Sequence, residues 1–231
     1  MNKDETRARL SEIGIIPVVR ASSFEEARFA AAAVADGGIS VVEITVGAPG
    51  AVEAIRELVS GLPEVLVGAG SVPDAETGRR CLDAGAEFLV TTGVSLDILE
   101  LGLKENRFVM AGALTPTEVL TAWKAGSDFV KIFPCAQVGG PAYIKALRGS
   151  LPDIPLVPTG GVNLHTASEF IQVGSAALGV GAELVLKPAL RSRAHEVIRD
   201  MARRFVEAVQ EARRWMAPPV NHGVSHGRKA S

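Results

Sequence analysis

The fold is indicated first by the stretch Gly126–Pro134, which reads GSDFVKIFP. A glycine at the end of a helical pattern is followed by a small residue, a spacer and an apolar run of strand length. The same order recurs in segments 37–41 (GGISV), 85–89 (GAEFL) and 174–178 (GSAAL). Because glycine readily ends a helix in the left-handed conformation, each copy predicts a helix that turns directly into a buried strand.

Outside these segments the same alternation continues, so that eight apolar segments of strand length are separated by helical patterns. The expected strands are Ile15–Arg20, Val41–Thr45, Leu66–Ala69, Phe88–Thr91, Val109–Ala111, Phe129–Phe133, Leu156–Pro158 and Ala177–Val180. The expected helices are Phe24–Asp36, Ala51–Ser60, Pro73–Ala84, Leu96–Glu105, Pro116–Ala125, Pro141–Arg148, His165–Val173 and a longer Arg193–Trp215. Eight such units favour an α/β fold of the closed (β/α)8 TIM-barrel type over an open, doubly wound sheet. We expect one barrel domain over residues 1–216, with an N-terminal helix.

Capping residues support several of these helix starts. Ser22 and Ser23, Ser95 and Thr115 each precede the first turn of an expected helix, and Asn163 is expected to cap the helix after the seventh strand. Their side-chain oxygens can accept hydrogen bonds from backbone N–H groups that the first helical turn leaves unpaired.

The composition excludes several classes of protein. The 231 residues carry 24 Lys and Arg against 26 Asp and Glu, a formal charge of −2, which lacks the basic field of a nucleic-acid binder. Apolar residues make up 47%, which excludes disorder as the main state. No apolar segment has the length of a membrane span, the first residues lack a signal-peptide pattern, and the two cysteines lack metal-ligand spacing. We therefore expect a cytoplasmic protein with no metal and no membrane or nucleic-acid partner.

The last stretch, residues 217–231, has a different composition. It combines Pro218–Pro219, two histidines, glycine, serine and Lys229 without an apolar pattern. This composition predicts a disordered tail, and a partner-binding peptide is the alternative.

Three charged residues occupy apolar strands or their ends, where barrel enzymes place their chemistry. Lys131 is the only lysine in the middle of an apolar strand, Glu43 lies within a second strand, and Arg20 ends the first. An unprotonated lysine amine can attack a carbonyl to form a Schiff base, and a nearby carboxylate can move the protons of that reaction. The alternative for Lys131 and Glu43 is a buried ion pair. Arg20 is expected to bind an anionic substrate group, or else to form a salt bridge at the barrel mouth.

Glycine-rich loops follow the last two strands. Gly160 and Gly161 follow the seventh strand and Gly181 the eighth, where barrels commonly bind phosphate through backbone N–H groups. A tight turn without a ligand is the alternative. The earlier segment 68–71 (GAGS) lacks the third glycine of a dinucleotide fingerprint, so no nucleotide cofactor is expected. Cys135 could be a nucleophile, but no histidine occupies a comparable strand end, which favours an inert side chain.

Five motifs, in this order, carry a family resemblance: EIT at 43–45, GAGSV at 68–72, LTPTE at 114–118, KIFP at 131–134 and PTGGV at 158–162. From about Ile15 to Val185 the chain resembles the class I 2-keto-3-deoxy-6-phosphogluconate (KDPG) and 4-hydroxy-2-oxoglutarate (KHG) aldolases. The resemblance implies reversible cleavage of a 2-keto-4-hydroxy acid to pyruvate and an aldehyde, either glyceraldehyde 3-phosphate or glyoxylate. It also implies a homotrimer that needs no cofactor.

The resemblance further implies roles for individual residues. Lys131 would be the Schiff-base lysine, and Glu43 the general acid and base acting with a water. Ser71 would replace the usual threonine that contacts the pyruvyl carboxylate, and Thr159 would be the threonine that sets stereoselectivity. The remaining candidates are Thr45 and Phe133 for substrate binding, and Gly160, Gly161, Gly181 and Ala182 for phosphate binding.

Two positions depart from the family pattern. Gly47 stands where many relatives have a carboxylate-binding arginine, so Ser71, backbone amides and Arg20 are the candidates for that task. Ala182 stands where a serine usually contacts phosphate, and the backbone donors remain. We expect weakened phosphate binding, which makes a shorter, unphosphorylated substrate a candidate. Two alternative functions are another phosphate-binding barrel enzyme and a catalytically inactive barrel used for assembly or binding.

Overall fold

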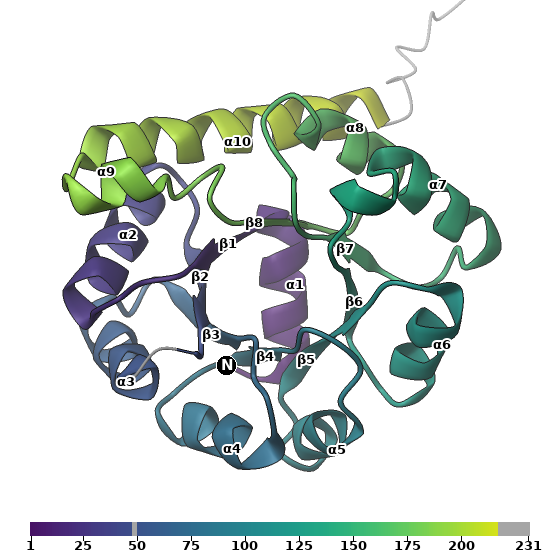
Figure 1. Ribbon diagram of the computed structural model, residues 1–231, viewed down its shortest axis with the longest axis horizontal. Helices are drawn as coiled ribbons and strands as arrows, with labels where there is room; N and C mark the ends of the chain where they lie inside the picture. The colour runs from purple at the N-terminus through teal and green to yellow at the C-terminus, as the bar shows by residue number, and fades with distance from the viewer. Residues whose placement is uncertain (48–49, 217–231) are drawn as a thin grey trace, which may run out of the picture.

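Eight parallel strands form a ring surrounded by helices in the computed structural model, which describes residues 1–47 and 50–216 (Figure 1). The strands are β1 (Ile15–Val19), β2 (Val41–Thr45), β3 (Leu66–Gly70), β4 (Phe88–Val90), β5 (Phe108–Ala113), β6 (Phe129–Ile132), β7 (Leu156–Pro158) and β8 (Leu178–Val180). They pair in the order β7-β6-β5-β4-β3-β2-β1-β8, and a parallel bridge between Thr159 and Gly179 joins the two ends of this order. The predicted (β/α)8 barrel is confirmed.

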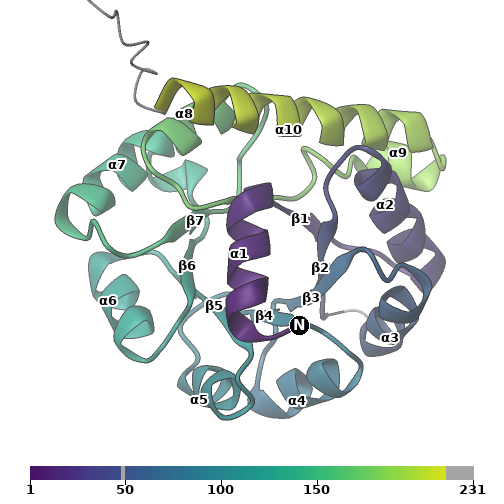
Figure 2. The same cartoon turned by 180° about the vertical axis from the view of Figure 1, so that it is seen from behind.

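The helices lie outside the strands, except for the first, which lies across one end of the ring (Figures 1 and 2). They are α1 (Lys3–Ile13), α2 (Phe24–Asp36), α3 (Ala51–Gly61), α4 (Ala75–Asp83), α5 (Leu96–Lys104), α6 (Pro116–Lys124), α7 (Pro141–Ser150), α8 (Ala167–Gln172), α9 (Lys187–Arg191) and α10 (His195–Met216), with a short 3₁₀ helix η1 (Ala136–Val138) before α7. The long α10 packs against α2 and α8. Within the described ranges, no helix has both the length and the apolar character of a membrane span.

Left-handed glycines make the turns that the sequence repeat predicts. Gly38, Gly85, Gly126 and Gly174 have φ angles of +96°, +100°, +94° and +94°, and each stands between a helix and an even-numbered strand. In the first copy it is the second glycine, not Gly37, that adopts this conformation. A side chain at such an angle would be strained, so glycine sets where the chain leaves the helix.

The capping predictions hold at some helices and fail at others. Ser23 caps α2, and Thr115 caps α6 in a capping box with Glu118. Ser95 precedes α5 but makes no capping hydrogen bond, because its hydroxyl bonds to the Asp97 carboxylate instead.

Three expected helix starts are wrong by two residues. The helix expected from Pro73 begins at Ala75, because the Asp74 side chain caps it by accepting a hydrogen bond from the Thr77 backbone. The helix after β7 begins at Ala167, because the Asn163 side chain accepts hydrogen bonds from the backbone of His165 (2.9 Å) and Thr166 (3.2 Å) and forms a local turn. The expected helix Arg193–Trp215 begins at His195, because Arg193 has a φ of +52° and separates α10 from α9. The expected tail, residues 217–231, lies outside the described residues.

Aromatic side chains contribute to the core around the fourth to sixth strands. Phe88, Phe108 and Phe129 are buried, and consecutive rings meet edge to face at centroid distances of 6.4 and 5.1 Å. A Cβ at Gly68 would collide with the Phe88 ring, so β3 makes room for it. Phe129 is two residues before Lys131 on the same strand face, which places this aromatic layer one step below the lysine.

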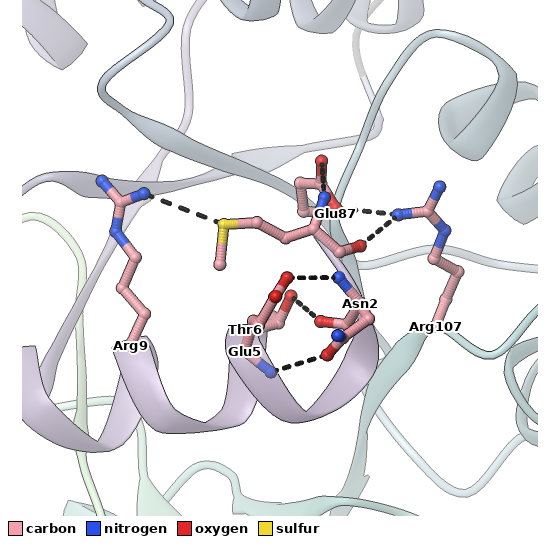
Figure 3. A network of polar contacts seen from close by, with 7 residues as sticks. Asn2, Glu5, Thr6, Arg9, Glu87 and Arg107 are labelled. Atoms are coloured by element: carbon pink, nitrogen blue, oxygen red, sulfur yellow. Dashed lines mark hydrogen bonds and ion pairs between the residues drawn. The ribbon is translucent and has the colours of Figure 1, made fainter.

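The amino end of the barrel is closed by α1 (Figure 2). Its first turn is fixed by a capping box between Asn2 and Glu5, and the Glu87 carboxylate accepts from Arg107 at 2.8 Å (Figure 3). Lys3 and Arg7 of α1 form ion pairs with the buried Asp128, which precedes β6. These partners precede strands, so α1 covers the end opposite to that where barrel enzymes work.

Candidate active site

Lys131 lies in the interior of the barrel, on β6, with 4% of the residue exposed. Its Nζ atom is 3.9 Å from Oε1 of Glu43 on β2 and 5.5 Å from the centroid of the Phe133 ring. The barrel therefore brings together a lysine and a carboxylate that are 88 positions apart in the sequence (131 − 43 = 88).

The Glu43 side chain has room to extend toward the lysine because the neighbouring strand β3 has glycine at the positions beside it. Glu43 pairs in register with Gly68, and a Cβ at Gly70 would overlap with the Glu43 carboxylate. The carboxylate is 1% exposed, and its Oε1 has no hydrogen-bond partner within the described residues. At 3.9 Å the ammonium and carboxylate are close enough to attract each other but too far apart to share a hydrogen bond. The two residues thus form the buried pair that was the alternative interpretation of their sequence positions, with one carboxylate oxygen left unbonded.

A pocket of about 330 Å³ opens between the strand ends of β1, β6, β7 and β8. Arg20 lies in it, as the first residue after β1 rather than the last residue of the strand. The other predicted site residues along its wall are Phe133, Thr159, Gly160, Gly161, Gly181 and Ala182. The structure therefore gathers Arg20 and both glycine loops at one place, beside the aromatic ring that neighbours Lys131.

The backbone of the two loops leaves donors for an anion. Gly160 and Gly161 have φ angles of +87° and +78°, and a Cβ at either would press on Phe133 or Ala136. Within the described part of the chain, the N–H groups of Gly161 and Ala182 donate to no protein acceptor. Such free N–H groups can bind an anionic oxygen, as the sequence predicts for this place.

Thr159 follows β7 in the wall of this pocket. It is 6% exposed and packs its hydroxyl over Gly179, where a Cβ would collide with it. Thr45 ends β2, and Ser71 follows β3 with a left-handed φ of +54°. Neither Thr45 nor Ser71 lines this pocket: Thr45, on the strand of Glu43, borders a separate hollow beside α2 and α3, and Ser71 follows the neighbouring strand β3.

Two polar residues in the pocket were missed by the sequence analysis. Glu183 and Gln137 line it together with Arg20. Glu183 is exposed and resembles an ordinary surface residue, and Gln137 is in the η1 turn. The signal for Glu183 is its place directly after Ala182 in the loop that follows β8.

The two cysteines are not nucleophiles. Burial raises the pKa of the Cys135 thiol to about 12 and that of Cys81 to about 11. Both thiols are therefore protonated at neutral pH, and the thiolate is the reactive form. Cys135 packs under the loop, with its Sγ atom 3.8 Å from the carbonyl oxygen of Gly140.

A buried lysine beside a buried carboxylate, at the carboxyl end of parallel barrel strands, is the arrangement of lyases that work through a Schiff base on lysine. Three comparisons with known proteins specify the family. The family model described as KDPG and KHG aldolase matches residues 6–201. The 2-dehydro-3-deoxy-phosphogluconate aldolase of Pseudomonas aeruginosa is 32% identical over 92% of this chain and 99% of that protein.

Other relatives agree with this assignment. The KHG/KDPG aldolase of Escherichia coli is 28% identical over 85% of this chain and 92% of that protein. The KDPG aldolase of Legionella pneumophila, solved with pyruvate captured as a covalent carbinolamine, has a TM-score of 0.80 at 29% identity, covering 85% of this chain and 96% of that one. The chain belongs to the KDPG and KHG aldolase family, and it is a class I aldolase.

Proposed function

We propose that Lys131 is the Schiff-base lysine of this aldolase and that Glu43 is its general acid and base. The observation that carries this proposal is the 3.9 Å separation of Nζ and Oε1 inside the barrel. In the part of the chain that the structure describes, Lys131 is the only buried lysine. Phe133, whose ring centroid lies 5.5 Å from Nζ, also lines the strand-end pocket that holds Arg20.

The reaction follows from this geometry. The unprotonated Nζ attacks the C2 carbonyl of a 2-keto-4-hydroxy acid, and the resulting carbinolamine loses its hydroxyl as water when the protonated Glu43 supplies a proton. Glu43, now ionised, then takes the proton of the C4 hydroxyl. The electrons of the C3–C4 bond move toward the imine, which yields an enamine and the free aldehyde. Protonation of C3 and hydrolysis of the imine release pyruvate and return the lysine.

The pocket around Arg20 fits the aldehyde end of the substrate. Arg20 lines it with the loops after β7 and β8, whereas Ser71 lies on the side of β3. This placement favours Arg20 as a partner of the distal anionic group. Ser71 and nearby backbone amides are then the candidates for the pyruvyl carboxylate, in place of the arginine that Gly47 replaces. Phe133 and Thr159, which line the same pocket, are the candidates for contact with the middle of the substrate.

Both KDPG and KHG are proposed as substrates. The preference for the phosphorylated substrate, KDPG, is expected to be smaller than it would be with serine at position 182. Ala182 offers no hydroxyl to a phosphate, and the Glu183 carboxylate lines the same pocket, where it repels a dianion more than a single carboxylate. Arg20 and the free backbone N–H groups still attract both anions. We also propose that the protein acts in the cytoplasm as a homotrimer. The exposed Leu96 and Leu103 of α5 are candidates for apolar contact between subunits.

Exchange of the pyruvate methyl protons in D₂O tests this function without a choice of aldehyde. An aldolase of this type converts pyruvate to the enamine and back, so the NMR signal of the methyl group should disappear in the presence of the wild-type protein. Cleavage of KDPG and KHG, followed by pyruvate release, completes the test. Another phosphate-binding barrel enzyme or an inactive barrel would exchange no methyl protons, and that result would overturn the proposal.

A further inference from the structure

Thr45, the last residue of β2, carries an unusual hydroxyl. Its Oγ1 is shielded from solvent and has no hydrogen-bond partner among the described residues. Buried hydroxyls nearly always have a partner, because an unpaired one loses its bonds to water and gains none in return. The mechanism proposed above does not use this hydroxyl.

The unpaired hydroxyl is on the strand that carries Glu43. Thr45 is two residues after Glu43, so both side chains point to the same face of β2. Thr45 pairs in register with Gly70, and it is at Gly70 that the Glu43 carboxylate ends, because a Cβ there would overlap with Oε1. Paired residues of neighbouring strands have backbones about 4.8 Å apart. The strand register therefore sets Thr45 beside Gly70, the same residue against which the Glu43 carboxylate ends.

Two side chains that both adjoin Gly70 have a buried, unpaired oxygen, and one shared hydrogen-bond partner could satisfy both oxygens. Oε1 of Glu43 and Oγ1 of Thr45 are both buried and unbonded, although they are on the same strand. They do not bond to each other, so a small hydroxyl-bearing molecule that bonds to both would satisfy both. A purely structural role would not need the hydroxyl, because valine has the same shape and suits a strand equally well.

We propose that Thr45 is a positioning residue of the aldol reaction, whose hydroxyl holds the water through which Glu43 exchanges protons with the substrate. The proposal rests on the function proposed above for Lys131 and Glu43. During cleavage the proton of the C4 hydroxyl passes to this water, and one proton of the water passes to Glu43. During dehydration of the carbinolamine the transfer runs in the opposite direction. The Thr45 hydroxyl keeps its own proton and fixes where the water sits.

Thr45→Val and Thr45→Ser separate this role from a structural one. Thr45→Val keeps the shape and removes the hydroxyl, and we expect kcat for cleavage to fall by about 10- to 100-fold, a part of the full acid–base effect. The KM should change by less than about threefold, because a group that acts on proton transfer contributes little to ground-state binding. Thr45→Ser keeps the hydroxyl and should restore kcat to within about threefold of wild type.

Thr6→Val is the matched control. Thr6 is a fully buried threonine in α1 at the opposite end of the barrel, where its hydroxyl donates to the Asn2 carbonyl at 3.1 Å. This variant should lower the Tm and leave kcat unchanged, whereas Thr45→Val should lower kcat at a Tm near that of wild type.

Each outcome decides the question. A kcat for Thr45→Val within twofold of wild type would overturn the proposal, and so would a Thr45→Ser variant as slow as Thr45→Val. If Thr45→Val fails to fold, the kcat and KM of Thr45→Ala and Thr45→Ser decide in the same way. Failure of the proposed function has a different signature, because the wild-type protein would then neither exchange pyruvate protons nor cleave a 2-keto-4-hydroxy acid.

Discussion

Two buried carboxylates, Asp128 and Glu43, show how the two ends of the barrel differ. Asp128 at the amino end is 2% exposed, pairs with Lys3 and Arg7, and accepts a hydrogen bond from the Val109 backbone at 2.9 Å. Glu43 toward the carboxyl end is 1% exposed, and its Oε1 has no hydrogen bond within the described residues. Burial alone therefore does not identify a functional carboxylate. The state of its hydrogen bonds does.

Loss of the lysine amine should have the largest effect at the open end. We expect Lys131→Ala to lower kcat/KM for cleavage on the order of 10⁴-fold or more, because no other group can form the imine. Lys145→Ala, on the exposed side of α7, is the matched control and should retain full activity. Pyruvate release measures both. Substantial activity in Lys131→Ala would contradict the assignment of Lys131 as the Schiff-base lysine.

Glu43→Gln removes the charge of the unbonded carboxylate and keeps its size. We expect cleavage to slow by about 10²–10⁴-fold, since the amide cannot transfer protons as a carboxylate does. Exchange of pyruvate protons should also slow, while the circular dichroism spectrum and the Tm stay close to wild type. A cleavage rate within twofold of wild type would assign the proton transfer to another group.

Asp128→Ala tests the closed end, where the effect should fall on stability. The variant leaves Lys3 and Arg7 without their buried partner and the Val109 N–H without its acceptor. Because both cations are partly solvated, we expect a loss of about 2–3 kcal/mol in the free energy of unfolding, below the range for a fully buried pair. Urea denaturation measures it, and Asp4→Ala, which removes an exposed carboxylate of α1, the helix that carries Lys3 and Arg7, is the control. If Asp128→Ala instead lowered kcat strongly and left the free energy of unfolding unchanged, the amino end of the barrel would not be the purely structural end.

Ala182→Ser should give the smallest effect, in the distal pocket. A serine hydroxyl adds one hydrogen bond to a phosphate, so kcat/KM for KDPG should rise by up to about tenfold, since roughly 1.4 kcal/mol is one decade. The gain should appear in KM, because the phosphate is bound alike in ground and transition states. KHG serves as the internal control and should be cleaved at an unchanged rate. Equal gains for both substrates would show that the substitution acts on the barrel instead of the phosphate.

Much of the fold could be predicted because its strands and turns depend on short-range sequence patterns. The left-handed glycines before the even strands and the apolar strand segments are short-range features, and they placed all eight strands. The start of α8 was missed because the Asn163 side chain can cap a helix or close its own turn, and the sequence does not distinguish these outcomes.

The site residues likewise fall into those that the sequence alone can predict and those that only the fold reveals. Lys131 and Glu43 stand out in the sequence because charge within a strand that is apolar on both sides has few explanations. Glu183 does not stand out, because an exposed glutamate becomes meaningful only when the loops after β1, β7 and β8 meet around it. The unpaired hydroxyl of Thr45 is invisible without the strand register that sets it opposite Gly70.

Borohydride reduction of the protein in the presence of pyruvate tests the central claim most directly. Reduction converts an imine to a stable amine, so peptide mass mapping shows which lysine carried the pyruvyl group. We expect one adduct, on the peptide that contains Lys131, and no adduct in Lys131→Ala. An adduct on a different lysine, or none in the wild-type protein, would contradict the assignment of Lys131 as the Schiff-base lysine.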